Sequence, residues 1–321
     1  MHPTDPEPHF LVIGECVADI VRTPGRPDRT HPGGSPANVA YGLARLGRRV
    51  TLVTQLGADA DGGLIRTHLA SAGVDVLTDG ARTPTPAAVV TLDAGGHASY
   101  AFDIGWSLGP VAVPVPPPDH VHIGSVAAVA DPGADTVLAL VEALRPAASV
   151  SYDPNVRPVL MGDHARAVAR VERCVALSDL VKASDEDLDW LYPGRPPEQV
   201  ARRWLELGPA AVLVTLGDRG SLVLTADGRA AVAARPGVVA DTVGAGDSFT
   251  AATLDALAGL GRLGATGRSR KPRWELGLLR RVAGYASAAA SVTVSRAGAN
   301  PPDAAELRAV TGGAGLLSAG L

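Results

Sequence analysis

Short apolar runs alternate with helical patterns along most of the chain. The first run, Phe10–Glu15, is apolar up to a glycine, which is typical of a buried strand. The segment 37–46 places Val39, Leu43 and Leu46 on one face, and Gly47 is suited to end a helix. Five more strands are predicted at Val50–Val53, His120–Gly124, Ser149–Tyr152, Asp179–Lys182 and Ala211–Thr215. Three further helices are predicted: one that ends at Ala72, one over Thr136–Leu144 and one over Pro197–Leu207. This alternation predicts an α/β fold in which helices cover both faces of a mostly parallel central sheet.

Two runs break the alternation. Ala87–Leu92 and Ala98–Asp103 flank a turn at Gly95 and Gly96 and predict a β-hairpin. In the second run, Tyr100 and Phe102 share a side, which makes one face of the hairpin apolar. The pattern alone leaves open whether this is an ordinary edge hairpin or a separate element.

Composition and charge narrow the class of protein. The chain has 321 residues, 46% of them hydrophobic, and its net charge of −4 gives no electrostatic case for a nucleic-acid or membrane partner. The first residues lack the basic and apolar regions of a signal peptide, and no apolar run approaches the roughly 20 residues of a membrane span. We therefore expect a cytoplasmic protein in which Cys16 and Cys174 are reduced core thiols.

The most informative segment is Asp241-Thr-Val-Gly-Ala-Gly-Asp247, which precedes a helical run. Glycines and a helix N-terminus present backbone amides to a ligand, which suits a phosphate. The carboxylate of Asp247 beside a phosphate is unfavourable, unless it takes the proton from an attacking hydroxyl. We therefore predict a kinase site in which Asp247 is the base and Gly244, Ala245 and Gly246 stabilise the transferred group. A simple loop with an Asp cap is the alternative. No Walker-type phosphate loop occurs in the sequence.

This segment resembles the C-terminal signature of the ribokinase-like (PfkB) carbohydrate kinases. The stretch 33–47, which begins Gly-Gly-Ser-Pro-Ala-Asn, resembles their N-terminal signature, and the likeness runs from about Phe10 to about Asp303. The resemblance implies a single ribokinase-like kinase domain over residues 1–321. It also implies a small β-sheet lid over the sugar, with strands from about 15–36 and 85–106, and a homodimer formed through that lid.

Besides Asp247, five residues are candidates for binding the sugar. The family's sugar-binding Asp aligns with Asp19, which as a lone residue after a strand would more often be a cap. Gly33 and Gly34 would let the backbone approach the sugar, and Asn38 offers a donor and an acceptor, although it can equally be a polar residue of a first helical turn. Arg157 lies in an Asp-Pro-Asn-Val-Arg stretch that resembles the fructokinase and 2-keto-3-deoxygluconate kinase branches, and it would meet a phosphate or a carboxylate.

A second group is expected to bind ATP. Asp153 would help to position the nucleotide, and Thr215-Leu-Gly-Asp-Arg-Gly220 resembles the family's nucleotide-contacting loop. A structural turn at Asp153 and a strand-to-strand turn at Thr215 are the alternatives. The expected nucleotide-binding residues are Asp153, Ser184, Thr215, Gly217, Asp218, Gly220 and Gly246.

Metal sites are implied by the resemblance alone. The family's Asn-x-x-Glu motif for magnesium appears as Ser184-Asp-Glu-Asp187, so Asp187 would act on Mg²⁺ indirectly and with altered geometry. Asp241, Val243 and Gly298 match the segments where many relatives bind a monovalent cation, and activation by K⁺ is left open.

These observations together predict an ATP-dependent and Mg²⁺-dependent sugar kinase acting on a primary hydroxyl. We favour fructose as the acceptor, with 2-keto-3-deoxygluconate next and ribose or a nucleoside after it. From another class, a catalytically inactive sugar-binding relative is the alternative, although Asp247 is present. A nicotinamide-dependent oxidoreductase is excluded because the first turn, Gly14-Glu-Cys-Val-Ala-Asp19, lacks the Gly-x-Gly-x-x-Gly pattern.

Overall fold

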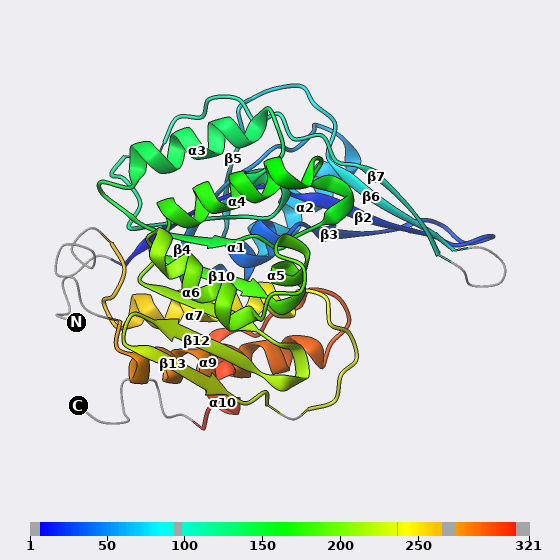
Figure 1. Cartoon of the computed structure of the whole chain (residues 1–321). Coiled ribbons are helices and arrows are strands. Elements are labelled where there is room, and N and C mark those ends of the chain that lie inside the picture. Colours follow the sequence, from blue (N-terminus) through cyan, green and yellow to red (C-terminus); the bar gives the residue numbers. More distant parts are fainter. Residues whose placement is uncertain (1–6, 93–97, 114, 236, 265–273, 313–321) are drawn as a thin grey trace.

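A nine-stranded sheet forms the centre of the molecule (Figure 1). The structure is a computed structural model, and it describes residues 7–92, 98–113, 115–235, 237–264 and 274–312. The strands follow the order β13-β12-β11-β10-β9-β8-β1-β4-β5. Their bounds are β1 His9–Ile13, β4 Arg49–Val53, β5 Asp75–Leu77, β8 His120–Gly124, β9 Ser149–Asp153, β10 Leu180–Ser184, β11 Ala211–Thr215, β12 Ser221–Thr225 and β13 Gly228–Val232.

The strands from β5 to β11 pair in parallel, and β12 and β13 add an antiparallel hairpin at one edge. The predicted fold class is therefore confirmed. The six predicted strands are present with small shifts in their bounds. The short strand β5 and the hairpin of β12 and β13 are not among them. The apolar content of the hairpin is broken by Thr225 and Gly228.

Helices cover both faces of this sheet. One face carries α1 Ser35–Arg45, α2 Ala60–Ser71, α7 Ala245–Gly259, α9 Leu276–Val294 and α10 Ala304–Val310, and the other carries α3 Gly133–Leu144, α4 His164–Leu177, α5 Asp185–Leu191 and α6 Pro197–Leu207. Short 3₁₀ turns are η1 Val126–Ala128, η2 Pro158–Leu160 and η3 Gly217–Arg219. Two buried clusters, one on each face, explain why the strands read as continuous apolar runs.

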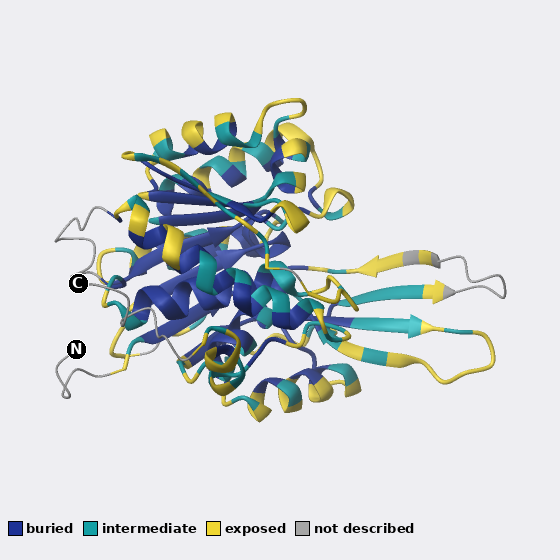
Figure 2. Cartoon of the chain, turned by 90° about the horizontal axis from the view of Figure 1, so that it is seen from below, coloured by how far each residue is buried: buried dark blue, intermediate teal, exposed yellow. Residues whose placement is uncertain are grey.

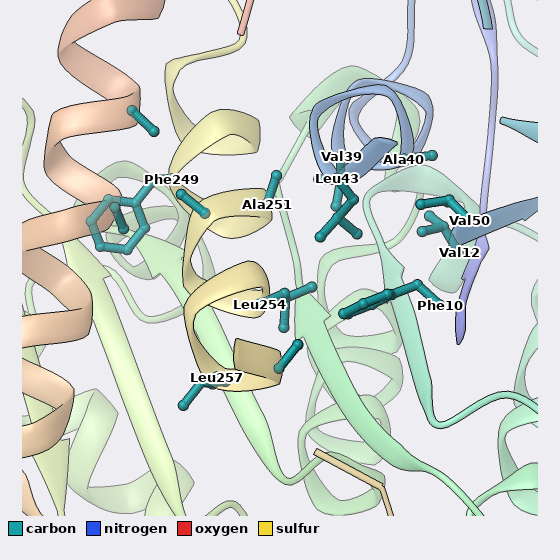
Figure 3. Packing of buried hydrophobic residues seen from close by; sticks show 14 of the residues in the cluster. Phe10, Val12, Val39, Ala40, Leu43, Val50, Phe249, Ala251, Leu254 and Leu257 are labelled. Carbon is teal, nitrogen blue, oxygen red and sulfur yellow. The ribbon is translucent and has the colours of Figure 1, made fainter. Parts of the chain in front are cut away.

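Helices α1 and α7 pack closely against each other on one face of the sheet (Figure 3). A Cβ at Gly42 of α1 would come to 3.0 Å from the Cβ of Ala251 in α7, so a glycine permits this approach. Leu43 of α1, Leu254 of α7 and Phe10 of β1 fill the space between the helices and the sheet. This contact fixes the N-termini of the two helices relative to each other.

Four strands form a separate small sheet that projects from the body of the molecule (Figures 1 and 2). They are β2 Val17–Arg22, β3 Arg29–Gly33, β6 Ala87–Leu92 and β7 Ala98–Asp103, in the order β3-β2-β6-β7. The predicted hairpin strands pair antiparallel as β6 and β7, and β2 pairs in parallel with β6. The predicted turn at Gly95 and Gly96 and the side chain of Tyr100 lie outside what the structure describes. The strands fall within the two segments expected to form a lid.

In the part of the chain that the structure describes, none of the helices combines the length and the apolar character that crossing a lipid bilayer requires.

Candidate active site

The N-terminus of α7 lies at the carboxyl edge of the parallel strands, where open α/β sheets bind ligands. Its N-cap, Gly244, has φ 75°, and a Cβ there would come to 2.6 Å from that of Ala299, so glycine is required twice over. No side chain caps the first turn. Ala245 N donates to Thr242 O at 3.3 Å, whereas the amides of Gly246 and Asp247 have no side-chain partner among the residues that the structure describes. Helix-end amides of this kind are suited to an anion.

Asp247 sits in the first turn of α7 and is held by two side chains from α1. Oδ1 accepts a hydrogen bond from Ser35 Oγ at 2.6 Å, and Oδ2 accepts one from Asn38 Nδ2 at 2.8 Å. Burial raises the pKa of Asp247, the bonds from Ser35 and Asn38 oppose this, and the charge of Asp153 adds to it. A carboxylate with a raised pKa and a fixed orientation suits a general base. Ser35 was not predicted, although it stands one helical turn before Asn38.

Four of the residues predicted to bind the sugar lie on β2, on β3 and at the start of α1, the helix that holds Asp247. Asp19 lies in β2, opposite His31 of β3, and burial raises its pKa to about 6. A Cβ at Gly33 would overlap the Asp19 carboxylate. Gly34 is the N-cap of α1 with φ 99°, and a Cβ there would come to 2.5 Å from the carbonyl oxygen of Glu15. Both glycines are thus required by the local packing, and they connect Asp19 with the helix that holds Asp247.

Arg157 faces the same region from the loop after β9. Its Nη1 donates to Val156 O at 2.9 Å and to Asn155 Oδ1 at 3.0 Å, which orients the guanidinium. Its charge is near enough to lower the pKa of both Asp19 and Glu15. Arg157 therefore lies on the same side of the site as Asp19 and Glu15.

Glu15, which sequence reasoning did not single out, is a buried carboxyl just beyond β1. Its Oε2 accepts a hydrogen bond from Ala127 N of η1 at 3.1 Å. Burial raises its pKa to about 7, against hydrogen bonds from Ser125 and Ala127. It therefore ties the sugar-side loop to η1 and carries a proton at slightly acidic pH.

We expect Glu15→Gln to change the pH dependence of stability. Between pH 4.5 and about 7, Glu15 keeps its proton in the folded state but loses it in the unfolded state. Its contribution to the free energy of unfolding is therefore complete below pH 4.5 and is lost as the pH rises through this window. This pKa difference corresponds to roughly 3 kcal/mol of unfolding free energy. Between pH 5 and pH 8, urea unfolding should therefore show the wild type losing up to that much more stability than Glu15→Gln.

Glu306→Gln is the matched control with the opposite sign. Hydrogen bonds from Arg296 and from the Asp303 amide lower the pKa of Glu306 to about 2, so its charge stabilises the fold above pH 4.5. Glu306→Gln should lose stability at pH 8. An identical pH dependence for wild type and Glu15→Gln would show that Glu15 is not protonated in the fold.

An ion pair between Asp153 and Lys182 lies beneath the first turn of α7. Lys182 Nζ donates to Asp153 Oδ2 at 2.9 Å, and Thr250 Oγ1 of α7 donates to the same oxygen at 3.3 Å. Asp153 is fully buried and Lys182 is 6% exposed. The sequence predicts Asp153 near the nucleotide, and it predicts Lys182 only as the last residue of a strand. The missed signal is a lysine within an apolar strand, because lysine is rarely buried without a partner.

Ser184 and Asp187 form the capping box of α5. Ser184 Oγ accepts from Asp187 N at 3.0 Å, and Asp187 Oδ2 accepts from Ser184 N at 2.7 Å. Asp187 Oδ1 accepts from Val156 N at 2.7 Å, which ties α5 to the Arg157 loop. Burial raises the pKa of Asp187, and the charge of Asp153 adds to this. Both carboxylate oxygens therefore have backbone partners.

The Thr215–Gly220 turn joins β11 to the antiparallel β12. Thr215 lies opposite Ser184 in register, so the turn begins next to the capping box. Gly217 has φ 60° and an open surface around it. A Cβ at Gly220 would overlap the carbonyl oxygen of Val232, so this glycine is explained by packing against β13. Asp218 is exposed within the turn.

Asp241, Val243 and Gly298 are brought together by hydrogen bonds. Asp241 Oδ1 accepts from Val243 N at 3.0 Å, and Oδ2 accepts from Gly298 N at 2.8 Å. These two bonds lower the pKa of Asp241. The carboxylate thus joins the loop before α7 to the loop after α9.

The described residues include no cluster of three or more His, Cys, Asp or Glu side chains that would hold a metal ion. Asp187 is bonded to the backbone, so the donor set fits a Mg²⁺ ion held mainly by phosphates and water. The geometry therefore joins an uncapped helix N-terminus, the buried carboxylate of Asp247 and the polar residues of β2 and α1.

Comparison with known proteins agrees with this geometry. Residues 8–306 match the pfkB family of carbohydrate kinases. A fructokinase from Rhizobium leguminosarum bv. trifolii is 33% identical over 259 residues, which cover 77% of this chain and 79% of that protein.

Two solved structures resemble the whole fold. A fructokinase from Xylella fastidiosa with bound ATP has a TM-score of 0.82 and 26% identity, covering 95% of this chain and 98% of that one. A double-mutant fructokinase from Vibrio cholerae O395 with fructose, ADP and a potassium ion has a TM-score of 0.77 and 25% identity, covering 95% and 99%.

Proposed function

Because this chain belongs to the pfkB family of carbohydrate kinases, we propose that it transfers the γ-phosphoryl group of ATP to a primary hydroxyl of fructose. The observation that carries the proposal is the buried carboxylate of Asp247, fixed by Ser35 and Asn38 at an uncapped helix N-terminus. Fructose is supported by three bacterial fructokinases that are 33% to 35% identical to this chain.

The reaction follows from these positions. The sugar lies against Asp19, Gly34 and Asn38, with Arg157 at its other side. Asp247 takes the proton of the attacking hydroxyl while a bond forms between that oxygen and the γ-phosphorus. The bond from the γ-phosphorus to the β,γ-bridging oxygen breaks, and ADP leaves with that oxygen. The amides of Ala245 and Gly246 stabilise the charge that develops on the phosphoryl oxygens.

The nucleotide would lie between the α7 N-terminus and the Thr215–Gly220 turn, with Gly217 and Asp218 exposed to it. Ser184 and Asp187 would orient magnesium-bound water. Mg²⁺, when bound, supplies charge that neutralises the β- and γ-phosphates. Asp153 would act on this site through Lys182, since it is itself fully buried.

We also propose a monovalent-cation site beside the anion-binding turn. Asp241 holds the two loops that contain Val243 and Gly298, whose backbone oxygens would coordinate K⁺. The potassium ion of the Vibrio cholerae structure supports this assignment.

The small sheet is proposed to act as a lid within a single kinase domain, and a second copy of the chain would pair through it. Asp19 and Gly33 lie on this sheet, so its position affects the sugar directly.

The free, buried thiols of Cys16 and Cys174 support a cytoplasmic location.

The test is ATP turnover measured with Mg²⁺ and four acceptors: fructose, 2-keto-3-deoxygluconate, ribose and adenosine. We expect fructose to give the highest kcat/KM. A preference for 2-keto-3-deoxygluconate would contradict fructose as the acceptor. Arg157 would then be the partner of the acid's carboxylate. This sugar acid is the second candidate because the charge of Arg157 lies near Asp19. A lack of turnover with all four would favour an inactive sugar-binding relative.

A further inference from the structure

Lys182 is a buried cation directed at the α7 side of the sheet. In β10, Leu180 belongs to the core on the side of α1, α7 and α9, and Val181 and Ala183 belong to the core on the other side. Because strand residues alternate between faces, Lys182 points with Leu180 toward α7. A lysine at this depth requires an anionic partner, and Asp153 supplies it at 2.9 Å.

The ammonium lies next to the phosphate-binding turn. A Cβ at Gly246 would come to 2.9 Å from Lys182 Nζ, so Gly246 leaves room for this group. A cation at a helix N-terminus is unfavourable by itself, because both carry positive charge. An anion placed between them would reverse the sign of this interaction.

Lys182 retains capacity to bind that anion. An ammonium has three N–H donors, and in the described part of the chain Asp153 accepts from one of them. Asp153 is itself held by Thr250, which lies one helical turn beyond Asp247. The ammonium is therefore fixed rather than mobile, and its remaining donors lie beside Gly246.

We propose that Lys182 is a further catalytic residue, whose ammonium binds the γ-phosphoryl group during transfer and is held in place by Asp153. This inference rests on the proposed kinase function. Lys182 keeps its proton throughout and contributes charge only, while Asp247 accepts the proton of the hydroxyl. The charged groups that face it are Asp153 from β9, Asp187 from α5 and Asp247 from α7.

The electrostatics agree with a permanently charged lysine. Burial acts to lower the pKa of Lys182, but the charges of Asp153, Asp187 and Asp247 outweigh it and raise the pKa above its ordinary value. The ammonium therefore stays charged at neutral pH.

The experiment compares Lys182→Met, Lys182→Arg and the double variant Lys182→Met/Asp153→Asn. The double variant avoids leaving a buried carboxylate without its partner, and so separates catalysis from folding. We expect kcat to fall about 100-fold in Lys182→Met and in the double variant, with KM values changed less than about threefold. Lys182→Arg should recover part of kcat. Lys271→Met changes the only other lysine, outside the described residues, and should behave as wild type.

A second measurement isolates the transferred group. Binding of ADP alone and of ADP with aluminium fluoride is measured by calorimetry. Lys182→Met should bind ADP like wild type but lose on the order of 100-fold of the extra affinity that aluminium fluoride gives. This measurement requires no sugar turnover, so it tests Lys182 even if fructose is not the acceptor.

The proposal is overturned if the folded double variant keeps kcat within about fivefold of wild type, or keeps the extra affinity for aluminium fluoride. It is also overturned if both Met variants are unfolded, because the ion pair would then be structural. A wild-type protein without turnover but with the expected loss of fluoride affinity would contradict the proposed acceptor and leave Lys182 supported.

Discussion

Asp247→Asn is expected to lower kcat by about 1,000-fold while the protein remains folded. Asparagine fills the same space. Its Oδ1 can still accept from Ser35, and its Nδ2 can donate to Asn38 once the Asn38 amide turns to present its oxygen, but it cannot accept the proton of the attacking hydroxyl. KM values for sugar and ATP should change little, because the amides of the α7 N-terminus remain in place. Steady-state kinetics and thermal unfolding of the same preparations would check both parts.

The pH dependence of the wild type should report the same group. Because burial raises the pKa of Asp247, the fraction of enzyme with a competent base falls as the pH is lowered, and kcat/KM should fall with it. The acidic limb should lie above the pH at which an exposed aspartate titrates.

Asp255→Asn provides the matched control in the same helix. Asp255 is also buried and accepts hydrogen bonds from Arg48 Nε at 2.7 Å and from Tyr285 Oη at 2.8 Å, two turns away from the site. This variant should lose stability but keep kcat. If Asp247→Asn kept near-wild-type kcat, or if both variants lost activity equally, Asp247 would not be the base.

The sheet and its helices could largely be predicted from the sequence because their signals are local. A strand buried on both faces, such as β11, is a continuous apolar run, and α6 was predicted with its observed bounds, Pro197–Leu207. Helix α1 begins two residues earlier than predicted because Pro36 fits its first turn, where no amide hydrogen is required. The edge strands β13 and β5 escaped prediction because an edge tolerates polar residues and glycine, and β12 escaped it together with its hairpin partner β13.

The site was only partly predictable because some of its contacts join distant segments. Glycine-rich motifs identified Asp247 and Gly34 directly. Ser35 and Lys182 contribute through partners 212 and 29 residues away in the chain, and no short pattern shows such a pairing. Their burial, seen only in the fold, is what marks them.

Asp19→Ala is expected to lower kcat/KM for the sugar by about 1,000-fold, mostly through KM. A carboxylate that binds two hydroxyls makes two charge-assisted hydrogen bonds, each contributing about 1.5–3 kcal/mol. Ser35 and Asn38 hold Asp247 through hydrogen bonds of their own, so the base should remain intact and kcat should change less. Kinetics at varied sugar concentration would separate the two effects.

Asp28→Ala is the control in the loop that joins β2 and β3 of the same small sheet. Asp28 forms an ion pair with Arg22 in which both side chains are about half exposed, and such pairs contribute little to stability. Loss of this ion pair should leave KM for the sugar unchanged. If Asp19→Ala and Asp28→Ala lowered kcat/KM equally, the cause would be damage to the sheet rather than to the sugar site.

The pKa of Asp19 adds a test that a purely structural residue would not pass. Burial raises this pKa to about 6, so the carboxylate binds hydroxyls as an anion only above that pH. KM for the sugar in the wild type should therefore rise as the pH falls below about 6. In Asp19→Ala, KM should already be high and should not show this rise. A wild-type KM that stays constant through this range would mean that Asp19 does not bind the sugar through its charge, and the sugar-binding assignment would then have to move to Asn38 and Arg157.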